Sequence, residues 1–238
     1  MQKTISALLS IAFLFSCSEK KTDKNLHITG NIKGFKKGTL FIQRIVDTSL
    51  VAIDTIKIDG NSHFTSDLKI DSPEMLYLFI DRGVTNSVDT NLPFFVEPGT
   101  INIDTSLDFF TADAKISGSK NQELYDEYKK VVSRYVDQNL ELIQKRFMAY
   151  KNNNAAELAK IQEEQDAILK RKYLYTTNFA VNHSDYEVAP YLAVAEIYDI
   201  NLKFLDTIQK SMTPKVAKSL YGKKLDKLII ERKKLEAK

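Results

Sequence analysis

Three histidines, His27, His63 and His183, are the residues from which a Ser–His–acid hydrolase would have to be built. His27 and His63 fall in segments with the pattern of strands, where surface or half-buried positions are typical. His183 is followed directly by Ser184 and Asp185, which are the residue types of a catalytic triad. Adjacent residues do not usually point at one another with catalytic geometry, and a local turn that caps the next helix accounts better for this tripeptide. We therefore expect no catalytic residue among them.

Metal and cofactor signatures are equally sparse. The chain has one cysteine and three scattered histidines, which excludes an intramolecular disulfide, a CxxC redox pair and a cysteine-rich zinc site. There is no HExxH or EF-hand pattern, and the tripeptide DGN at 59–61 offers oxygen ligands but fits a hairpin turn better. Neither GxGxxG nor a P-loop is present. The sequence predicts no metal site and no cofactor.

The one cysteine, Cys17, follows an apolar segment close to the N-terminus. Lys3 precedes a stretch of 11 mostly apolar residues at 5–15, which is too short to span a bilayer and typical of a signal-peptide core. The motif LFSC at 14–17 resembles a bacterial lipobox, although Phe15 stands where a small residue is usual. The resemblance implies cleavage before Cys17 and acylation of that residue. An ordinary cleaved signal, or a short buried helix with a chance cysteine, is the alternative.

The interpretation of this motif as a lipobox predicts the location of the protein and the roles of its first two segments. Residues 1–16 are predicted to be a lipoprotein signal peptide and residues 17–25 a tether. The acylated Cys17 would join the protein to a membrane of the cell envelope, and Ser18 in place of aspartate favours the outer membrane. The formal charge of +3, from 34 basic and 31 acidic residues, is too balanced for a nucleic-acid partner.

The remaining chain divides into two halves by composition. Seven of the eight glycines lie before residue 119, which favours strands and turns first and helices second. Alternating or apolar runs separated by turn signals predict strands near 26–32, 39–44, 51–58, 62–68, 75–80, 94–96, 101–104 and 114–116. We therefore expect an α+β protein, with an antiparallel β-sandwich or barrel-like domain at 26–118 and a helical domain at 119–238.

The helical half begins with a capping signal. Ser119 is predicted as the N-cap of the first helix, with Gln122 reaching back to it as in a capping box. Apolar residues then recur at intervals of three and four as far as Phe147, and a second long helix should complete a helical hairpin. Two shorter helices follow, and Thr213 and Pro214 are predicted to start a last helix that runs close to the C-terminus.

Two further features bear on binding. Residues 213–238 hold nine lysines and arginines against three acids, which indicates either a solvated helix face or contact with anionic lipid or an acidic partner. Phe94-Phe95 and Phe109-Phe110 are adjacent pairs, so one member of each could be exposed for a ligand. The favoured alternative is that one ring faces the sandwich while the other packs beneath the helices.

The front of the chain resembles the domain of unknown function near the N-terminus of TlpA-like thiol–disulfide oxidoreductase lipoproteins of Gram-negative envelopes. The resembling segments are HITGNI at 27–32, VAIDTIKIDG at 51–60, FFVEPGTINI at 94–103, ISGSKN at 116–121, NHSD at 182–185 and SLYGKKL at 219–225. The resemblance implies an envelope-located β domain followed by helices. It does not carry over the redox activity, because the CxxC of the thioredoxin-like domain is absent here.

These observations predict an envelope lipoprotein that acts as a non-enzymatic binding or scaffolding module for an envelope protein, a peptide or a glycan. The alternative is an accessory subunit to a separate thioredoxin-like oxidoreductase, an expectation that rests on the resemblance alone. A hydrolase with an unrecognised pair of carboxylates is a third hypothesis, and it would need two acids that converge on one pocket.

Overall fold

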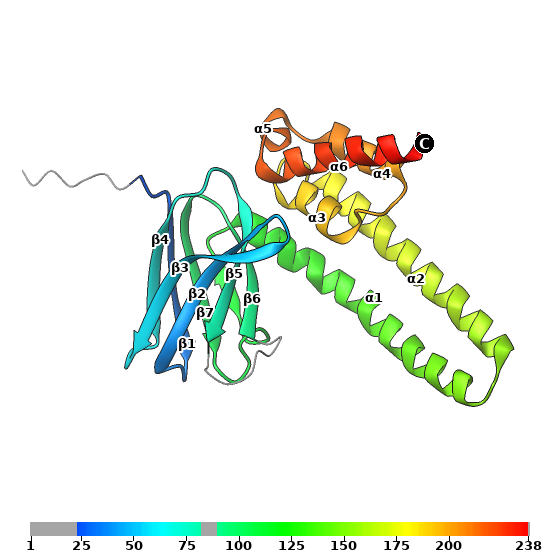
Figure 1. The fold of residues 1–238 in the computed structure, drawn as a ribbon, viewed down its shortest axis with the longest axis horizontal. Coiled ribbons are helices and arrows are strands. Elements are labelled where there is room, and N and C mark those ends of the chain that lie inside the picture. The colour runs from blue at the N-terminus through cyan, green and yellow to red at the C-terminus, as the bar shows by residue number, and fades with distance from the viewer. Residues whose placement is uncertain (1–22, 82–89, 238) are drawn as a thin grey trace, which may run out of the picture.

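The computed structural model describes residues 23–81 and 90–237, so Cys17 and the predicted signal segment lie outside the described residues. The strands form a β-sandwich at one end of the molecule and the helices extend from its side (Figure 1). Asn25, the last residue of the predicted tether, already belongs to the folded part. Its side chain accepts a hydrogen bond from the Ile70 amide at 2.9 Å and donates one to the Ile70 carbonyl at 2.8 Å.

Two four-stranded sheets make up the sandwich. The first has the order β4-β1-β7-β8 and the second β3-β2-β5-β6. The strands are β1 (Leu26–Lys33), β2 (Lys37–Val46), β3 (Ser49–Asp59), β4 (His63–Leu68), β5 (Glu74–Asp81), β6 (Asn91–Val96), β7 (Gly99–Ser106) and β8 (Lys115–Ser117). The predicted α+β class is therefore confirmed. Among the described residues the strands form an open sandwich of two sheets and not a closed barrel.

One pairing departs from the expected antiparallel arrangement. β1 and β7 run parallel, with Ile28 opposite Ile101 and Gly30 opposite Ile103. The other strand pairs, in the part of the chain that the structure describes, are antiparallel. The parallel pair arises because the chain passes through the second sheet twice between β1 and β7, so β7 comes back beside β1 in the same direction. Isoleucines that alternate in both strands fill the space between the sheets.

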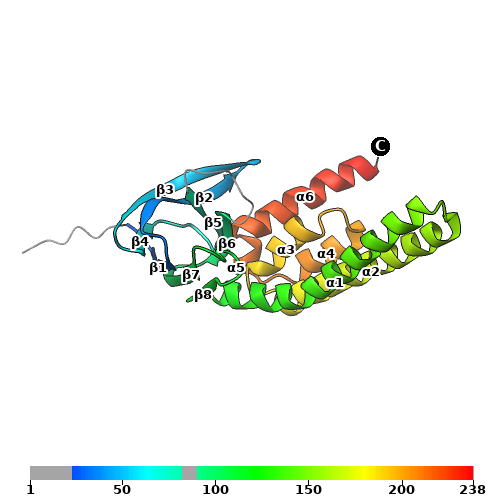
Figure 2. The same ribbon diagram turned by 90° about the horizontal axis from the view of Figure 1, so that it is seen from below.

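The helices are α1 (Lys120–Lys151), α2 (Ala155–Asn182), α3 (Val188–Glu196), α4 (Leu202–Ser211), α5 (Pro214–Ala217) and α6 (Leu220–Glu236). α1 and α2 form the predicted helical hairpin and lie side by side in both Figure 1 and Figure 2. None of the described helices has the length and apolar character needed to cross a bilayer.

The last predicted helix is interrupted. Thr213 caps α5 through its side chain as expected, but α5 ends at Ala217 and a new helix begins at Leu220. Ser219 caps this second helix, since its hydroxyl accepts a hydrogen bond from the Gly222 amide at 3.3 Å. The sequence pattern missed the break because Ser219 fits the surface of one long helix as well as it fits a cap.

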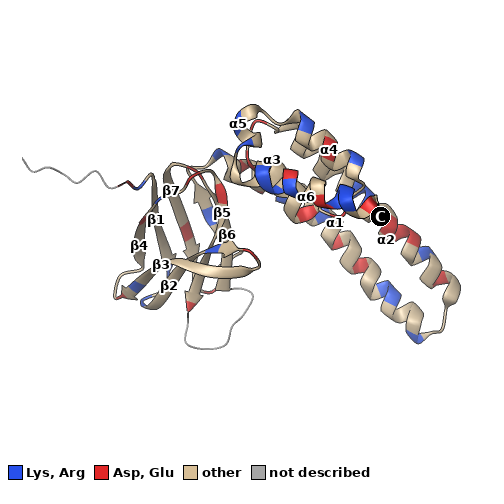
Figure 3. Cartoon of the chain, turned by 45° about the horizontal axis from the view of Figure 1, so that its top comes forward, with Lys and Arg blue, Asp and Glu red and all other residues tan. Residues whose placement is uncertain are grey.

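The basic residues of α6 are interspersed with acids, as Figure 3 shows. Lys233 Nζ lies 2.9 Å from Asp206 Oδ1 of α4, and Arg232 Nη2 lies 3.2 Å from Glu236 Oε1. The Arg232 guanidinium also donates to the carbonyls of Tyr198 and Ile200. These contacts favour the solvated face over a continuous basic surface for this helix.

Candidate functional site

The sandwich and the helices meet where α1 begins. The Ser119 hydroxyl accepts a hydrogen bond from the Gln122 amide at 3.1 Å, which confirms the predicted N-cap. The prediction that the Gln122 side chain reaches back to Ser119, as in a capping box, was wrong. Its Oε1 accepts from the Phe95 amide at 2.6 Å and its Nε2 donates to Asp126 at 2.9 Å. Gln122 thus bonds the outer edge of β6, which has no further strand beside it in the described sheet and is covered here by α1.

Asn121 joins three elements at the same point. Its Oδ1 accepts a hydrogen bond from the Val188 amide at the start of α3 at 2.8 Å. Its Nδ2 lies 2.9 Å from Glu97 Oε2 and 3.3 Å from Glu187 Oε2. Glu97 also accepts from the Lys120 amide at 2.7 Å, so it caps the first turn of α1. One buried amide therefore brings a carboxylate from the β6–β7 turn and a carboxylate from the start of α3 to the same helix end.

An aromatic core stabilises this junction from beneath. Phe95 of β6 meets the Tyr191 ring edge-on at a centroid distance of 5.5 Å, and Tyr191 lies 5.0 Å from Tyr221 of α6. The Tyr221 hydroxyl accepts a hydrogen bond from the Met75 amide at 3.0 Å. Burial raises the pKa of Tyr125 to about 12 and raises the pKa of Tyr191 and Tyr221 further. These phenols stay neutral at physiological pH and act as packing groups.

The favoured prediction for Phe94 and Phe95 is confirmed, because the two rings belong to different cores. Phe94 is buried between the two sheets, while Phe95 packs under the helices. The second pair behaves differently. Phe110 is buried in the sandwich, whereas Phe109 is 63% exposed. Only the first pair joins the two halves of the protein.

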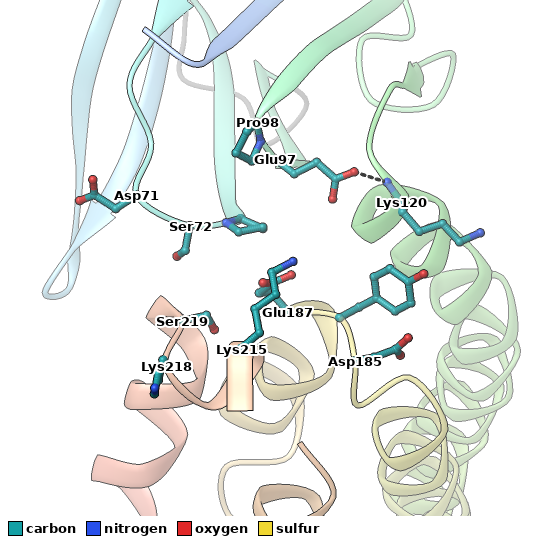
Figure 4. Close-up of a pocket in the computed structure, with 12 residues that line it drawn as sticks. Asp71, Ser72, Glu97, Pro98, Lys120, Asp185, Glu187, Lys215, Lys218 and Ser219 are labelled. Carbon is teal, nitrogen blue, oxygen red and sulfur yellow. Dashed lines mark hydrogen bonds between the residues drawn. The ribbon is translucent and has the colours of Figure 1, made fainter. Parts of the chain in front are cut away.

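A cleft of about 550 Å³ lies above this junction, between the sandwich and the ends of the helices. Figure 4 shows side chains from both halves around it. Its lining consists of Asp71, Ser72, Pro73, Glu97, Pro98, Lys120, Asp185, Tyr186, Glu187, Lys215, Lys218 and Ser219. Clefts of this volume at the boundary between two structural units are typical binding sites for small ligands and short segments.

The cleft carries charged side chains of both signs. Lys215 and Lys218, in and after α5, have no ion-pair partner within 4.0 Å among the described residues. Lys120 is less free, since its ammonium lies 2.8 Å from Glu123. On the acidic side, Glu187 is only 2% exposed, and its carboxylate has the single long hydrogen bond to Asn121. The cleft can therefore bind both a cationic and an anionic group of a ligand.

A smaller cavity of about 260 Å³ lies on the neighbouring side of the junction, around Arg44 and Glu74. The two residues form a bidentate pair, with Arg44 Nε and Nη2 lying 2.8 and 2.7 Å from the Glu74 carboxylate. Burial raises the pKa of Glu74 above its ordinary value, and the Arg44 guanidinium offsets part of that effect. Because both charges are already paired, this cavity offers less to a charged ligand than the cleft does.

The residues that the sequence offered for chemistry are dispersed. His27 Nδ1 lies 2.5 Å from Asp67 on the neighbouring strand, and the His63 ring bonds Asn61. His183 is the C-cap of α2 and packs on Phe179 at a centroid distance of 4.4 Å. The structure brings none of the three histidines together with a serine and an acid in the described hydrogen-bond network.

The structure describes residues 59–61, for which the sequence predicts a hairpin turn and not a calcium site. The tripeptide at 59–61 is the turn between β3 and β4, where Gly60 has a φ of +88°. Across residues 23–81 and 90–237, no group of three or more potential ligand side chains is close enough together for a metal ion. Cys17, the predicted lipidation site, lies outside these ranges.

Sequence reasoning missed the set of Glu97, Asn121 and Glu187. The capping pattern at 119–122 marked the place, but it indicated a local interaction within one helix end. Glu97 stood in an ordinary Glu-Pro-Gly turn and Glu187 in a connection between helices. Only the approach of three segments that are distant in sequence gives these side chains a common environment.

Comparison with protein families finds a match in the front part of the chain. Residues 26–125 match the family described as Domain of unknown function (DUF4369). That region spans the whole sandwich and the beginning of α1, including Asn121 and Gln122. No curated protein and no solved structure matches the chain. The rest of the helical half, with α2 to α6, lies outside the matched region.

Proposed function

We propose that this protein is a membrane-anchored lipoprotein of the cell envelope and that it acts as a non-enzymatic binding module, with the cleft as its binding site. The observation that carries the proposal is the pairing of a concave site with charged side chains of both signs at a hydrogen-bonded junction. The lipobox-like motif at 14–17 supports the envelope location, and Ser18 supports the outer membrane.

The charges of the cleft fit a peptide segment. Lys215 and Lys218 can bind a carboxylate, while the buried Glu187 can accept from an ammonium, a guanidinium or a backbone amide. A peptide supplies these groups together, through its side chains or its ends. A glycan without charged groups would form no ion pair with the lysines or with the carboxylate, so the charges of the cleft favour a peptide as the ligand.

The junction also supports binding because it is already ordered. Asn121 and Gln122 fix the start of α1 against β6, and the aromatic core joins β5 and β6 to α3 and α6. The two walls of the cleft are therefore held in position before a ligand arrives. A preformed site loses less free energy to ordering when it binds than a flexible one does.

The first experiment places a photo-crosslinking amino acid at position 218 in intact cells, and at Lys223 as a control. Lys218 lines the cleft, while Lys223 is exposed on α6 outside it. We expect a discrete adduct from position 218 that position 223 does not give. Lys215→Glu should weaken this adduct by at least about tenfold, since a charge-assisted hydrogen bond contributes roughly 1.5–3 kcal/mol and about 1.4 kcal/mol is a factor of ten.

Lys223→Glu is the matched control for Lys215→Glu, and it should leave the adduct at position 218 unchanged. Glu187→Gln, which keeps the shape of the side chain, should also weaken the adduct. An identical adduct pattern from positions 218 and 223, or an adduct that survives both Lys215→Glu and Glu187→Gln, would rule out the cleft as the binding site.

The anchor is tested separately through Cys17→Ser. Serine cannot carry a thioether-linked lipid, so we expect this variant to accumulate as unprocessed precursor without acyl label. Several acyl chains are needed for stable anchoring, at about 0.8 kcal/mol per buried CH₂. Metabolic labelling with a fatty acid and a shift in gel mobility give the measurement. Normal labelling of Cys17→Ser would show that the lipid is attached elsewhere.

The resemblance to TlpA-like lipoproteins supports a second candidate, in which the module assists a separately encoded thioredoxin-like oxidoreductase. The resembling segments include the Glu97 turn and the start of α1, so the same cleft would receive the redox partner. The adduct from position 218 decides between the candidates. A thioredoxin-like protein in the adduct favours the second, and a peptide or protein without CxxC favours the first.

A further inference from the structure

The apolar residues of α1 form two separate stripes, and only one of them is used within the described chain. Residues such as Tyr128 and Leu142 are buried, and Leu142 packs against Ile161 and Ile168 of α2. A second stripe is 48 to 73% exposed, although its members are all large and apolar. We call it the outer stripe, and it consists of Val136, Leu140, Ile143, Phe147 and Tyr150.

The spacing of the outer stripe is that of a coiled-coil seam. Its members follow one another at intervals of four, three, four and three residues, which keeps them on one face of a helix that packs against another helix. The distal half of the α1–α2 hairpin projects away from the sandwich and from the other helices in Figures 1 and 2. An exposed seam of this kind on a projecting hairpin marks an interaction surface.

We propose that the outer stripe pairs with the same stripe of a second copy of this chain, in an antiparallel arrangement. The two hairpins would then form a four-helix bundle. In the antiparallel register that we propose, Leu140 faces the second copy's Tyr150, and Ile143 faces its Phe147. Each layer occurs twice because of the two-fold symmetry, so four of the five stripe positions are buried.

Charge along the free edge of the stripe is complementary in this register. The same alignment places Asp137 next to Lys151 of the second copy, again twice, and brings the two Gln144 side chains together at the symmetry axis. Asp137 and Lys151 have no ion-pair partner in the described part of the chain. Lys151 lies at the seam already, since its ammonium is 4.9 Å from the centroid of the Phe147 ring.

The other edge of the stripe is closed by α2. Asn139 accepts a hydrogen bond from Gln165 Nε2 at 2.9 Å, and Arg146 donates to Gln165 Oε1 at 3.3 Å. A partner helix must therefore approach from the edge that carries Asp137, Gln144 and Lys151. The same edge of α1 carries both Asp137 and Lys151. Two copies of this edge can therefore form both ion pairs with each other, which favours a second copy over an unrelated helix.

The test uses the full acylated chain in detergent micelles, with Gln144→Cys as the reporter. Mild oxidation should link most of the Gln144→Cys chains into a disulfide dimer, because this position meets its own copy at the symmetry axis. Glu141→Cys is the control, since Glu141 is equally an exposed position of α1 but lies on the side away from the stripe. The unsubstituted chain reports any contribution from Cys17.

A charge exchange tests the register. Asp137→Lys should weaken the dimer about tenfold, because two attractive pairs become repulsive, and Asp137→Lys combined with Lys151→Asp should restore it. Both positions are exposed, so the fold of the monomer is retained, as circular dichroism can verify. A monomer at all concentrations, equal crosslinking of Gln144→Cys and Glu141→Cys, or no rescue by the double exchange would overturn the proposal. The last result would indicate a different occupant, such as a lipid surface or another protein.

Discussion

Replacing Phe95 with alanine is expected to lower the free energy of unfolding by about 3–5 kcal/mol, the usual range for a large aromatic ring removed from a core. Phe95 is fully buried, and it contacts Tyr191 and Tyr221 at centroid distances of 5.5 and 6.0 Å. It is also the ring through which β6 reaches the helices. The substitution should therefore loosen the attachment of the two halves as well as destabilise each of them.

Denaturant unfolding followed by circular dichroism gives the measurement. Phe109→Ala is the matched control, because Phe109 is the same residue type in the sandwich half but is 63% exposed. An exposed ring contributes little, so this variant should change stability by less than about 0.5 kcal/mol. Equal losses from Phe95→Ala and Phe109→Ala would show that the aromatic core does not hold the junction.

Gly118→Ala is expected to lower stability by about 3–5 kcal/mol through two effects that add. Gly118 has a φ of +99°, a conformation that alanine adopts only with strain. In addition, a Cβ atom at this position would lie 2.0 Å from the Thr100 carbonyl oxygen, which is backbone and cannot move aside easily. Because Gly118 immediately precedes the Ser119 cap, the displacement would also disturb the start of α1.

Gly60→Ala separates the two effects. Gly60 has a similar φ of +88°, but a Cβ atom there would have no neighbour within 4 Å. This variant should therefore show only the backbone strain, about 1–2 kcal/mol. The difference between the two variants in thermal or denaturant unfolding measures the steric part. A loss no greater for Gly118→Ala than for Gly60→Ala would mean that β7 and β8 yield to the added methyl group.

Local patterns predicted most of the elements. Alternation and turn residues placed the strands, and the Ser119 cap marked the boundary between the two halves to within one residue of α1. These features depend on residues that are neighbours in the sequence, so they can be predicted without knowledge of the fold. The parallel β1–β7 pair was not, because strand direction in a sandwich depends on where the chain crosses between sheets.

The positions of the long helices were predicted more reliably than the burial of the residues on their surfaces. Periodicity identified α1 and its apolar residues, but it did not separate those that pack against α2 from Val136, Leu140 and Ile143, which are exposed. Likewise, Thr213 and Ser219 both carry hydroxyls suited to a cap, and only the turn between α5 and α6 shows that each caps its own helix. The periodicity of apolar residues shows which residues share a face of a helix. Which element packs against that face depends on the tertiary structure.

By itself, the sequence determined the order of strands before helices, the cap at Ser119 and the lipobox-like motif that ends at Cys17, because each depends on residues close together in the chain. The tertiary structure alone decided that Glu97, Asn121 and Glu187 meet at one helix end. These residues come from a turn, a helix and a connection separated by 24 and 66 positions. Chain folding must bring such segments together before their charges share a cleft, and no local spacing encodes that approach.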